Sequence, residues 1–148
     1  MKKFSFGLET LLNYRITIEE KERLALSRLI LKLQAERKER DRLRAKRDET
    51  MAERTRMRGA REDDDDAHWY NTYLDRLECQ IKKCGERMAQ IQKELDAQKE
   101  LVIAARKNTK VLSTLKTKKS KEYDAAVEKL EQKTVEEIVV TRYVNRES

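Results

Sequence analysis

The sequence of 148 residues contains no proline and only three glycines, at positions 7, 59 and 85. Because these two residues supply most tight turns, an all-β or an alternating α/β fold would lack the turn signals that it needs. Aromatic residues make up only 5% of the chain and charged residues 43%, so the chain cannot cover a globular core. These scarcities leave two classes of protein, a disordered chain and an extended coiled coil.

Cysteines are also few, and long apolar runs are absent. Cys79 and Cys84 are five positions apart, a spacing that one helix cannot easily bridge with a disulfide, so free thiols in a reducing cytosol are expected. No apolar stretch approaches 18 residues, which predicts no transmembrane helix. The first six residues lack the apolar run of a secretory signal. We therefore expect a cytoplasmic protein.

Residues that could carry catalysis are equally scarce. His68 is the only histidine, and one histidine beside a loop cannot complete a Ser–His–Asp or Cys–His arrangement. A metal site would need further ligands at helical spacing, and a glycine-rich phosphate loop is missing. The sequence thus predicts a protein that is not an enzyme, with no catalytic residue, no cofactor and no metal.

An apolar seam in the second half of the chain decides between disorder and a coiled coil. From Tyr70 to Leu112, steps of four and three residues reach mostly apolar side chains, and the alternation holds for six heptads. This period of 3.5 residues is typical of a coiled coil, so we predict a helix over residues 67–143. A noisier pattern predicts another helix over residues 5–58. Arginines replace apolar residues there, and residues 40–57 are expected to pair most loosely.

The segment between the two predicted helices predicts a loop over residues 59–66. Gly59 can end the first helix. The four aspartates at positions 63–66 lie at the start of the second helix, beside the positive end of its dipole. Calcium loops space their oxygen ligands around a glycine turn, and this run does not. We interpret the aspartates as part of a loop and a helix cap rather than as a metal site.

A short loop makes the two helices antiparallel neighbours. Residues 101–121 hold seven lysines and arginines and no acid, and antiparallel pairing places them near the acidic residues Glu19, Glu20 and Glu22. The sequence therefore predicts an all-α, single-domain, antiparallel coiled-coil hairpin. From about Tyr123 the second helix is expected to extend past the N-terminus without a partner, and an unpaired amphipathic helix normally binds something else.

Three segments of the chain carry a resemblance to a known family. They are Phe4-x-Phe6-x-Leu8-x-x-Leu11-Leu12-x-Tyr14-Arg15 near the start, Trp69-Tyr70-Asn71-Thr72-Tyr73-Leu74-x-x-Leu77-Glu78-x-x-Ile81 in the middle, and Leu115-Lys116-x-Lys118-Lys119-x-x-x-Tyr123 with Glu136-Glu137-Ile138 in the last third. In this order they resemble the flagellar FliJ family over nearly the whole chain. The aspartate run at 63–66 departs from the family pattern.

The resemblance implies a soluble component of the flagellar type III export apparatus. It implies a hairpin similar to the central stalk of rotary ATPases, whose terminal segments enter the pore of the hexameric export ATPase and stimulate it. It also implies contact with the cytoplasmic domain of the export gate and escort of export chaperones. The expected location is the cytoplasm, peripheral to the inner membrane at the export apparatus.

Two sets of residues are predicted to bind these partners. Apolar and basic residues near both chain ends are candidates for ATPase binding, although the apolar ones could instead pack on each other: Phe4, Phe6, Leu8, Leu11, Leu12, Arg15, Ile138, Arg142 and Tyr143. The resemblance places gate binding at Tyr73, Leu77 and Cys84. Leu77 and Cys84 also lie on the predicted seam.

Three other functions fit the sequence less well. A stalk of a virulence-type injectisome would have the same shape. The basic residues between positions 37 and 47 could bind nucleic acid, but aromatic residues do not interleave with them and no base-reading module is visible. A purely structural coiled coil is the third alternative. We therefore expect protein partners, no nucleic acid, and only peripheral contact with a membrane.

Overall fold

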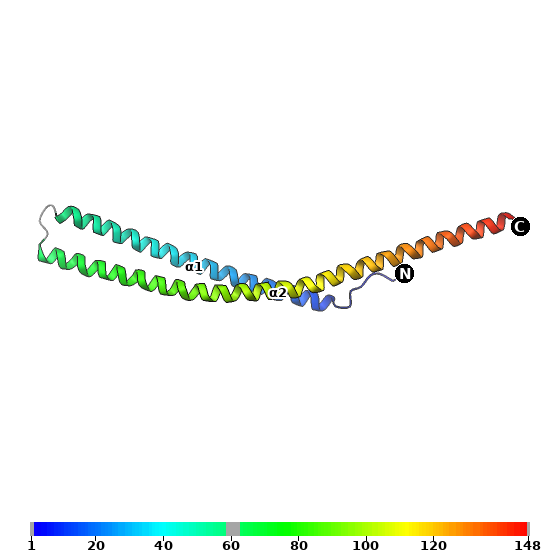
Figure 1. The fold of residues 1–148 in the computed structure, drawn as a ribbon, viewed down its shortest axis with the longest axis horizontal. Helices are drawn as coiled ribbons and strands as arrows, with labels where there is room; N and C mark the ends of the chain where they lie inside the picture. Colours follow the sequence, from blue (N-terminus) through cyan, green and yellow to red (C-terminus); the bar gives the residue numbers. More distant parts are fainter. Residues whose placement is uncertain (1, 59–62, 148) are drawn as a thin grey trace. The chain divides into compact units, whose positions relative to one another are not determined.

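The computed structural model describes residues 2–58 and 63–147, and it contains two helices in this part of the chain (Figure 1). They are α1, Glu9–Arg58, and α2, Asp64–Glu147. Hydrogen bonds join early α1 to late α2 and late α1 to early α2, so the helices pack antiparallel. The predicted all-α hairpin is confirmed. Gly59 and the rest of the predicted loop up to residue 62 lie outside the described residues.

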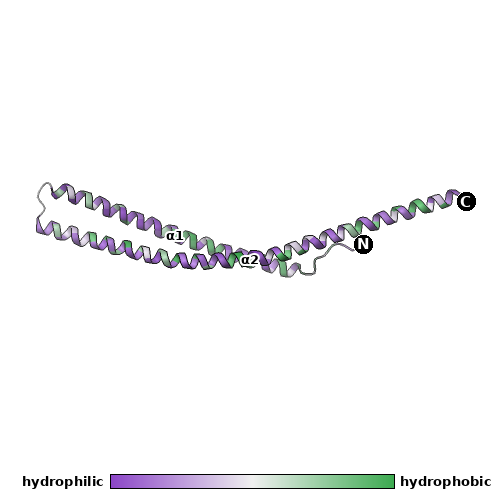
Figure 2. Cartoon of the chain, viewed as in Figure 1, coloured by the Kyte–Doolittle hydropathy of each residue, from purple (hydrophilic) through white to green (hydrophobic). Residues whose placement is uncertain are grey.

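Residues 21–102 form one compact unit, held together by an apolar seam between the helices. Leu43 of α1 packs with Leu77 and Cys84 of α2, and Tyr73 and Ile81 lie against this cluster. Figure 2 shows that apolar segments recur among hydrophilic ones along both helices. Burial of these side chains, rather than intrinsic helix propensity, stabilises helices of this kind.

The expectation of loose pairing over residues 40–57 is wrong. Leu43 and Thr50 are buried, at 4% and 5% exposed. Arg47 donates a hydrogen bond to Glu78 at 3.0 Å, and Arg54 donates one to the side chain of Asn71 at 2.8 Å. Arginine stems cover the seam while their guanidinium groups reach polar partners on α2, so these residues join the helices.

The other compact unit combines residues 1–20 with residues 103–148. Leu12 and Ala105 are buried, at 5% and 6% exposed. Lys116 forms an ion pair with Glu9 at 2.9 Å, and the hydroxyl of Thr109 donates to a backbone carbonyl of α1 at 3.3 Å. Polar contacts therefore accompany the buried apolar side chains in this unit.

The helix boundaries differ from the predicted ones by a few residues. Residues 2–6 are not helical, and α1 begins at Glu9, because Gly7 disfavours the helix. The backbone N–H of Asp66 donates to the Asp63 side chain at 2.8 Å, so Asp63 caps α2 as the N-cap residue. Asp64, Asp65 and Asp66 therefore form its first turn.

Helix α2 continues past the pairing with α1. Every residue from 128 to 147 is exposed, and the helix ends at Glu147 rather than at about residue 143, because no proline or glycine interrupts it. Within the described residues, neither helix contains a stretch that is both long and apolar enough to span a membrane.

Candidate protein-binding sites

The part of α2 that extends past α1, residues 128–147, is exposed throughout and is a candidate binding surface. Seven large apolar side chains on it are between 48% and 63% exposed: Leu130, Val135, Ile138, Val139, Val140, Tyr143 and Val144. Apolar side chains exposed together mark interaction sites. We call residues 128–147 the C-terminal arm.

The apolar side chains of the C-terminal arm lie on more than one side of the helix. Val135, Val139 and Tyr143 recur every four residues and form one row, since residues four apart are neighbours on a helix surface. Leu130 and Val144 are turned by roughly 100° or more from each residue of that row, given 3.6 residues per turn. A helix that is apolar on several sides is normally enclosed, so a single flat partner would leave part of the arm uncovered.

The N-terminal residues pack on α2 instead of on the C-terminal arm. The ring of Phe4 lies 5.7 Å from the ring of Tyr123, and the Tyr123 hydroxyl donates a hydrogen bond to the backbone carbonyl of Lys2. Phe6 is half-buried in a groove that Leu115 also lines. About 22 Å of helix separates Tyr123 from Ile138 at 1.5 Å per residue. The structure therefore does not bring the two predicted apolar groups together.

The remaining N-terminal candidates differ in exposure. Leu12 is buried in the seam, whereas Leu8 and Leu11 are 41% and 39% exposed. Arg15 is half-buried, and its backbone carbonyl accepts the hydrogen bond from Thr109. A partner of this end can reach Leu8 and Leu11 directly, while Leu12 supports the pairing of the helices.

Aromatic side chains gather on the first turns of α2. Trp69 is 55% exposed and stacks on Tyr73, with ring centroids 5.2 Å apart and planes 10° from parallel. Tyr70 is buried, at 5% exposed, as its seam position predicts, and the Arg54 guanidinium lies over its ring. Trp69 and the half-buried Tyr73 thus offer an aromatic surface next to a closed core.

Leu77 and Cys84, the other two gate-binding candidates, lie inside the seam. They are 4% and 1% exposed. Arg87 donates a hydrogen bond to the Cys84 sulfur at 3.2 Å and another to Glu36 at 3.0 Å, which covers the thiol. A partner can therefore touch Tyr73 while the helices stay paired, but it cannot touch Leu77 or Cys84.

Three arginines of the basic stretch between positions 37 and 47 form ion pairs with acidic neighbours. Arg42 forms an ion pair with Glu39 at 2.7 Å, and this hydrogen bond holds the pKa of the Glu39 carboxyl below its usual range. Arg40 pairs with Asp41, and Arg47 with Asp48. These three guanidinium groups are already engaged by carboxylates, which makes them poorer phosphate ligands and weakens the nucleic-acid alternative.

Two predicted features concern chemistry rather than binding. Cys79 and Cys84 are free thiols, as their spacing predicts. In residues 2–58 and 63–147, no three His, Cys, Asp or Glu side chains come together in a way that could hold a metal ion.

Leu130 and Val135 belong to the candidate binding surface by their exposure, but they were not among the residues predicted from the sequence. The available signal was the spacing of Val135, Val139 and Tyr143, which lies off the heptad positions.

Comparison with known proteins identifies a family. Residues 4–148 match the family described as Flagellar FliJ protein. No curated protein and no solved structure matches the chain.

Proposed function

The chain belongs to the FliJ family and is therefore a component of the flagellar type III export apparatus, and from this membership we propose that it is the stalk-like partner of the hexameric export ATPase. In this proposal the C-terminal arm enters the pore of the hexamer and stimulates ATP turnover. The protein acts in the cytoplasm, at the export apparatus on the inner membrane.

One observation carries the proposal: the C-terminal arm is exposed and apolar on more than one side. The pore of a ring surrounds a single helix and can bury several of its faces at once, whereas a groove buries only one. Burial contributes about 25 cal/mol per Å² of apolar surface, so an enclosing partner gains more from this helix than a groove does.

The N-terminal end supports the same site with a smaller surface. Leu8 and Leu11 are exposed where α1 begins, and Arg15 lies one to two turns further on. Positive charge at this end, including Lys2 and Lys3, favours an acidic mouth of the ring. We propose that these residues contact the entrance of the pore, while the C-terminal arm contacts the interior of the pore.

The proposed mechanism follows from the asymmetry of the arm. A helix whose apolar side chains are distributed unevenly around it contacts the subunits of a ring unequally, so it binds some subunit conformations better than others. Such differential binding shifts the conformational equilibrium of each subunit. The stalk thereby couples nucleotide state to its own orientation.

The test of this function is ATP turnover by the purified export ATPase with and without the chain. We expect the full chain to raise both the fraction of hexamer and the turnover per subunit. Unchanged turnover, measured at a chain concentration at which the two proteins co-purify, would show that binding of the chain does not stimulate the ATPase.

We propose that a second surface, around Tyr73, contacts the cytoplasmic domain of the export gate, and that the protein also escorts export chaperones. Replacing Tyr73 with alanine removes the ring that stacks on Trp69. We expect gate affinity, measured by titration calorimetry, to fall about tenfold, because exposed aromatic anchors dominate interfaces. Tyr14→Ala, which removes a 60% exposed ring elsewhere, is the control. Equal affinities of the two variants for the gate would show that Tyr73 is not part of the gate contact.

A further inference from the structure

Four lysines share one face of α2, on the side turned away from α1. The residues of α2 that face α1 in this unit include Ala105, which is buried, and Thr109 and Lys116, which bond to α1. Steps of three or eight residues on the opposite side join lysines that are all exposed: Lys107, Lys110, Lys118 and Lys121. Such steps keep side chains on one face of a helix. We call these four residues the lysine stripe.

The lysine stripe has no role in holding the described structure together. Lys116 pairs with Glu9, and Lys119 with Glu122, but the four stripe lysines have no ion pair or hydrogen bond with any residue in 2–58 or 63–147. Like charges three residues apart on a helix destabilise it. The arrangement therefore destabilises the fold slightly, and the stripe lysines make no ion pair or hydrogen bond within the described residues that would offset this.

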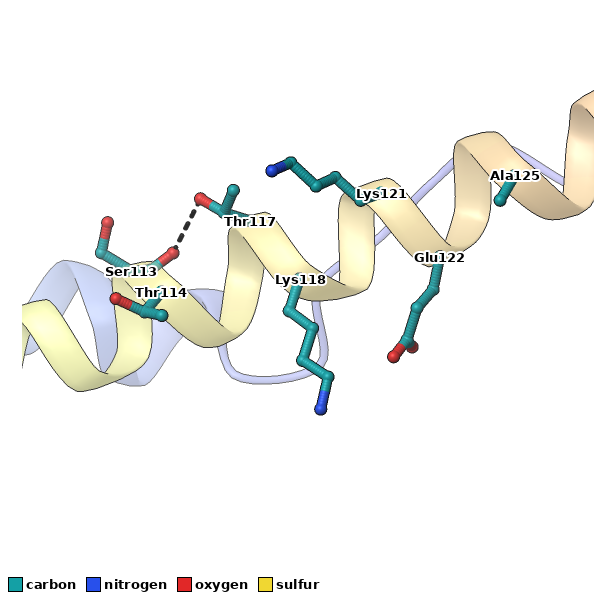
Figure 3. Close-up of a pocket in the computed structure, with 7 residues that line it drawn as sticks. All are labelled: Ser113, Thr114, Thr117, Lys118, Lys121, Glu122 and Ala125. Atoms are coloured by element: carbon teal, nitrogen blue, oxygen red, sulfur yellow. Dashed lines mark hydrogen bonds between the residues drawn. The ribbon is translucent and has the colours of Figure 1, made fainter.

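Apolar and hydroxyl side chains share this face with the lysines. Val111 is 68% exposed and Ile103 is 45% exposed. Figure 3 shows Lys118 and Lys121 extending from the helix, with Thr114 and Thr117 beside them. The Thr117 hydroxyl donates to the backbone carbonyl of Ser113 at 3.0 Å, which leaves its methyl group on the surface. The face is therefore both cationic and partly apolar.

We propose that the lysine stripe docks α2 on a bilayer surface rich in anionic lipid headgroups. Lysine is a hydrated point charge on a flexible stem and suits a diffuse layer of phosphates, whereas arginine suits fixed bidentate sites. Clusters of four or more basic residues on a helix bind anionic leaflets, and exposed valine and isoleucine can enter the headgroup boundary. Single-stranded nucleic acid would require aromatic stacking, and this face has no aromatic residue.

The face of α2 that carries the lysine stripe can also lie along a flat surface. From Ile103 to Lys121 the face runs for about 27 Å at 1.5 Å per residue, and α1 lies on the other side of α2. A bilayer can therefore contact all four lysines at once without displacing α1. Docking of this kind does not depend on the export ATPase, so the experiment below is independent of the proposed stalk function.

The test is co-sedimentation of the purified full chain with vesicles of phosphatidylglycerol and phosphatidylcholine, compared with pure phosphatidylcholine. We expect binding only to the anionic vesicles, weakening as salt is added. The variant K107Q/K110Q/K118Q/K121Q should bind at least about 100-fold more weakly, since each basic residue near the surface contributes roughly fivefold. The control K21Q/K32Q/K38Q/K46Q removes four exposed lysines of α1 and changes net charge equally, and it should bind within a few-fold of the wild type.

Two further measurements complete the test. Far-UV circular dichroism of both variants checks that the helices remain, and Val111→Ser should weaken vesicle binding a few-fold by removing the apolar contact. Equal losses in the two lysine variants, or equal binding to neutral vesicles, would overturn the proposal. So would a stripe-dependent affinity for polyglutamate or RNA in the absence of vesicle binding, because the occupant would then be another polyanion.

Discussion

Replacing Val139 and Tyr143 together with aspartate is expected to raise the chain concentration needed to stimulate the export ATPase. Both side chains belong to one row of the C-terminal arm and are 60% and 63% exposed. Two carboxylates in a desolvated pore would lose apolar contact and would themselves be buried without partners. Central apolar and aromatic anchors each contribute about 2 kcal/mol or more to binding, so at least about a 30-fold higher chain concentration should be needed for half-maximal turnover.

The matched control for this experiment is Leu24→Asp combined with Leu31→Asp. These leucines are 53% and 64% exposed on α1, so the exchange of apolar for acidic side chains is the same but outside the proposed site. Both double variants should keep the helical signal in circular dichroism, since none of the four side chains is buried. Full stimulation by Val139→Asp/Tyr143→Asp would contradict insertion of the arm.

Replacing Leu77 with alanine is expected to destabilise the hairpin by about 2–5 kcal/mol, the usual range for a buried leucine. Leu77 is 4% exposed and packs with Leu43 and Cys84 in a buried apolar cluster between the helices. Folded domains are stable by about 5–15 kcal/mol in total, so this loss is large. The free energy of unfolding should be measured by urea titration followed by circular dichroism.

Leu31→Ala is the control for Leu77→Ala, because Leu31 is 64% exposed. Its effect should stay within about 0.5 kcal/mol, as for most surface substitutions. Comparable losses in the two variants would mean that the seam does not provide the stability of the hairpin. A gate-binding defect in Leu77→Ala would likewise be ascribed to the seam, since a partner cannot touch this side chain while the helices are paired.

The paired part of the fold could be predicted from sequence because its signal is periodic. The heptad steps from Tyr70 onward placed Leu77 and Cys84 in the core, and they are buried. Predictions failed where a residue could act in two ways. Arg47 was expected to weaken the seam, but its guanidinium group reaches Glu78, because a long side chain can be apolar along its stem and charged at its tip.

The candidate sites were harder to predict, because exposure depends on which residues find a partner. Phe4 and Ile138 were grouped as one apolar end, yet Phe4 packs on Tyr123 and Ile138 stays exposed. Spacing along the chain does not show where a non-helical N-terminal segment will fold back. The lysine stripe became visible only once α1 was placed on the other side of α2.

Site-specific photo-crosslinking tests the central claim most directly. A photoreactive amino acid is placed at Ile138 in one variant and at Trp69 in another, and each is irradiated with the export ATPase under turnover conditions. The account predicts ATP-dependent crosslinks from position 138 to residues that line the pore of the hexamer, and none from position 69. Crosslinks from position 69 to the pore, or from position 138 only to the outer surface of the ring, would contradict it.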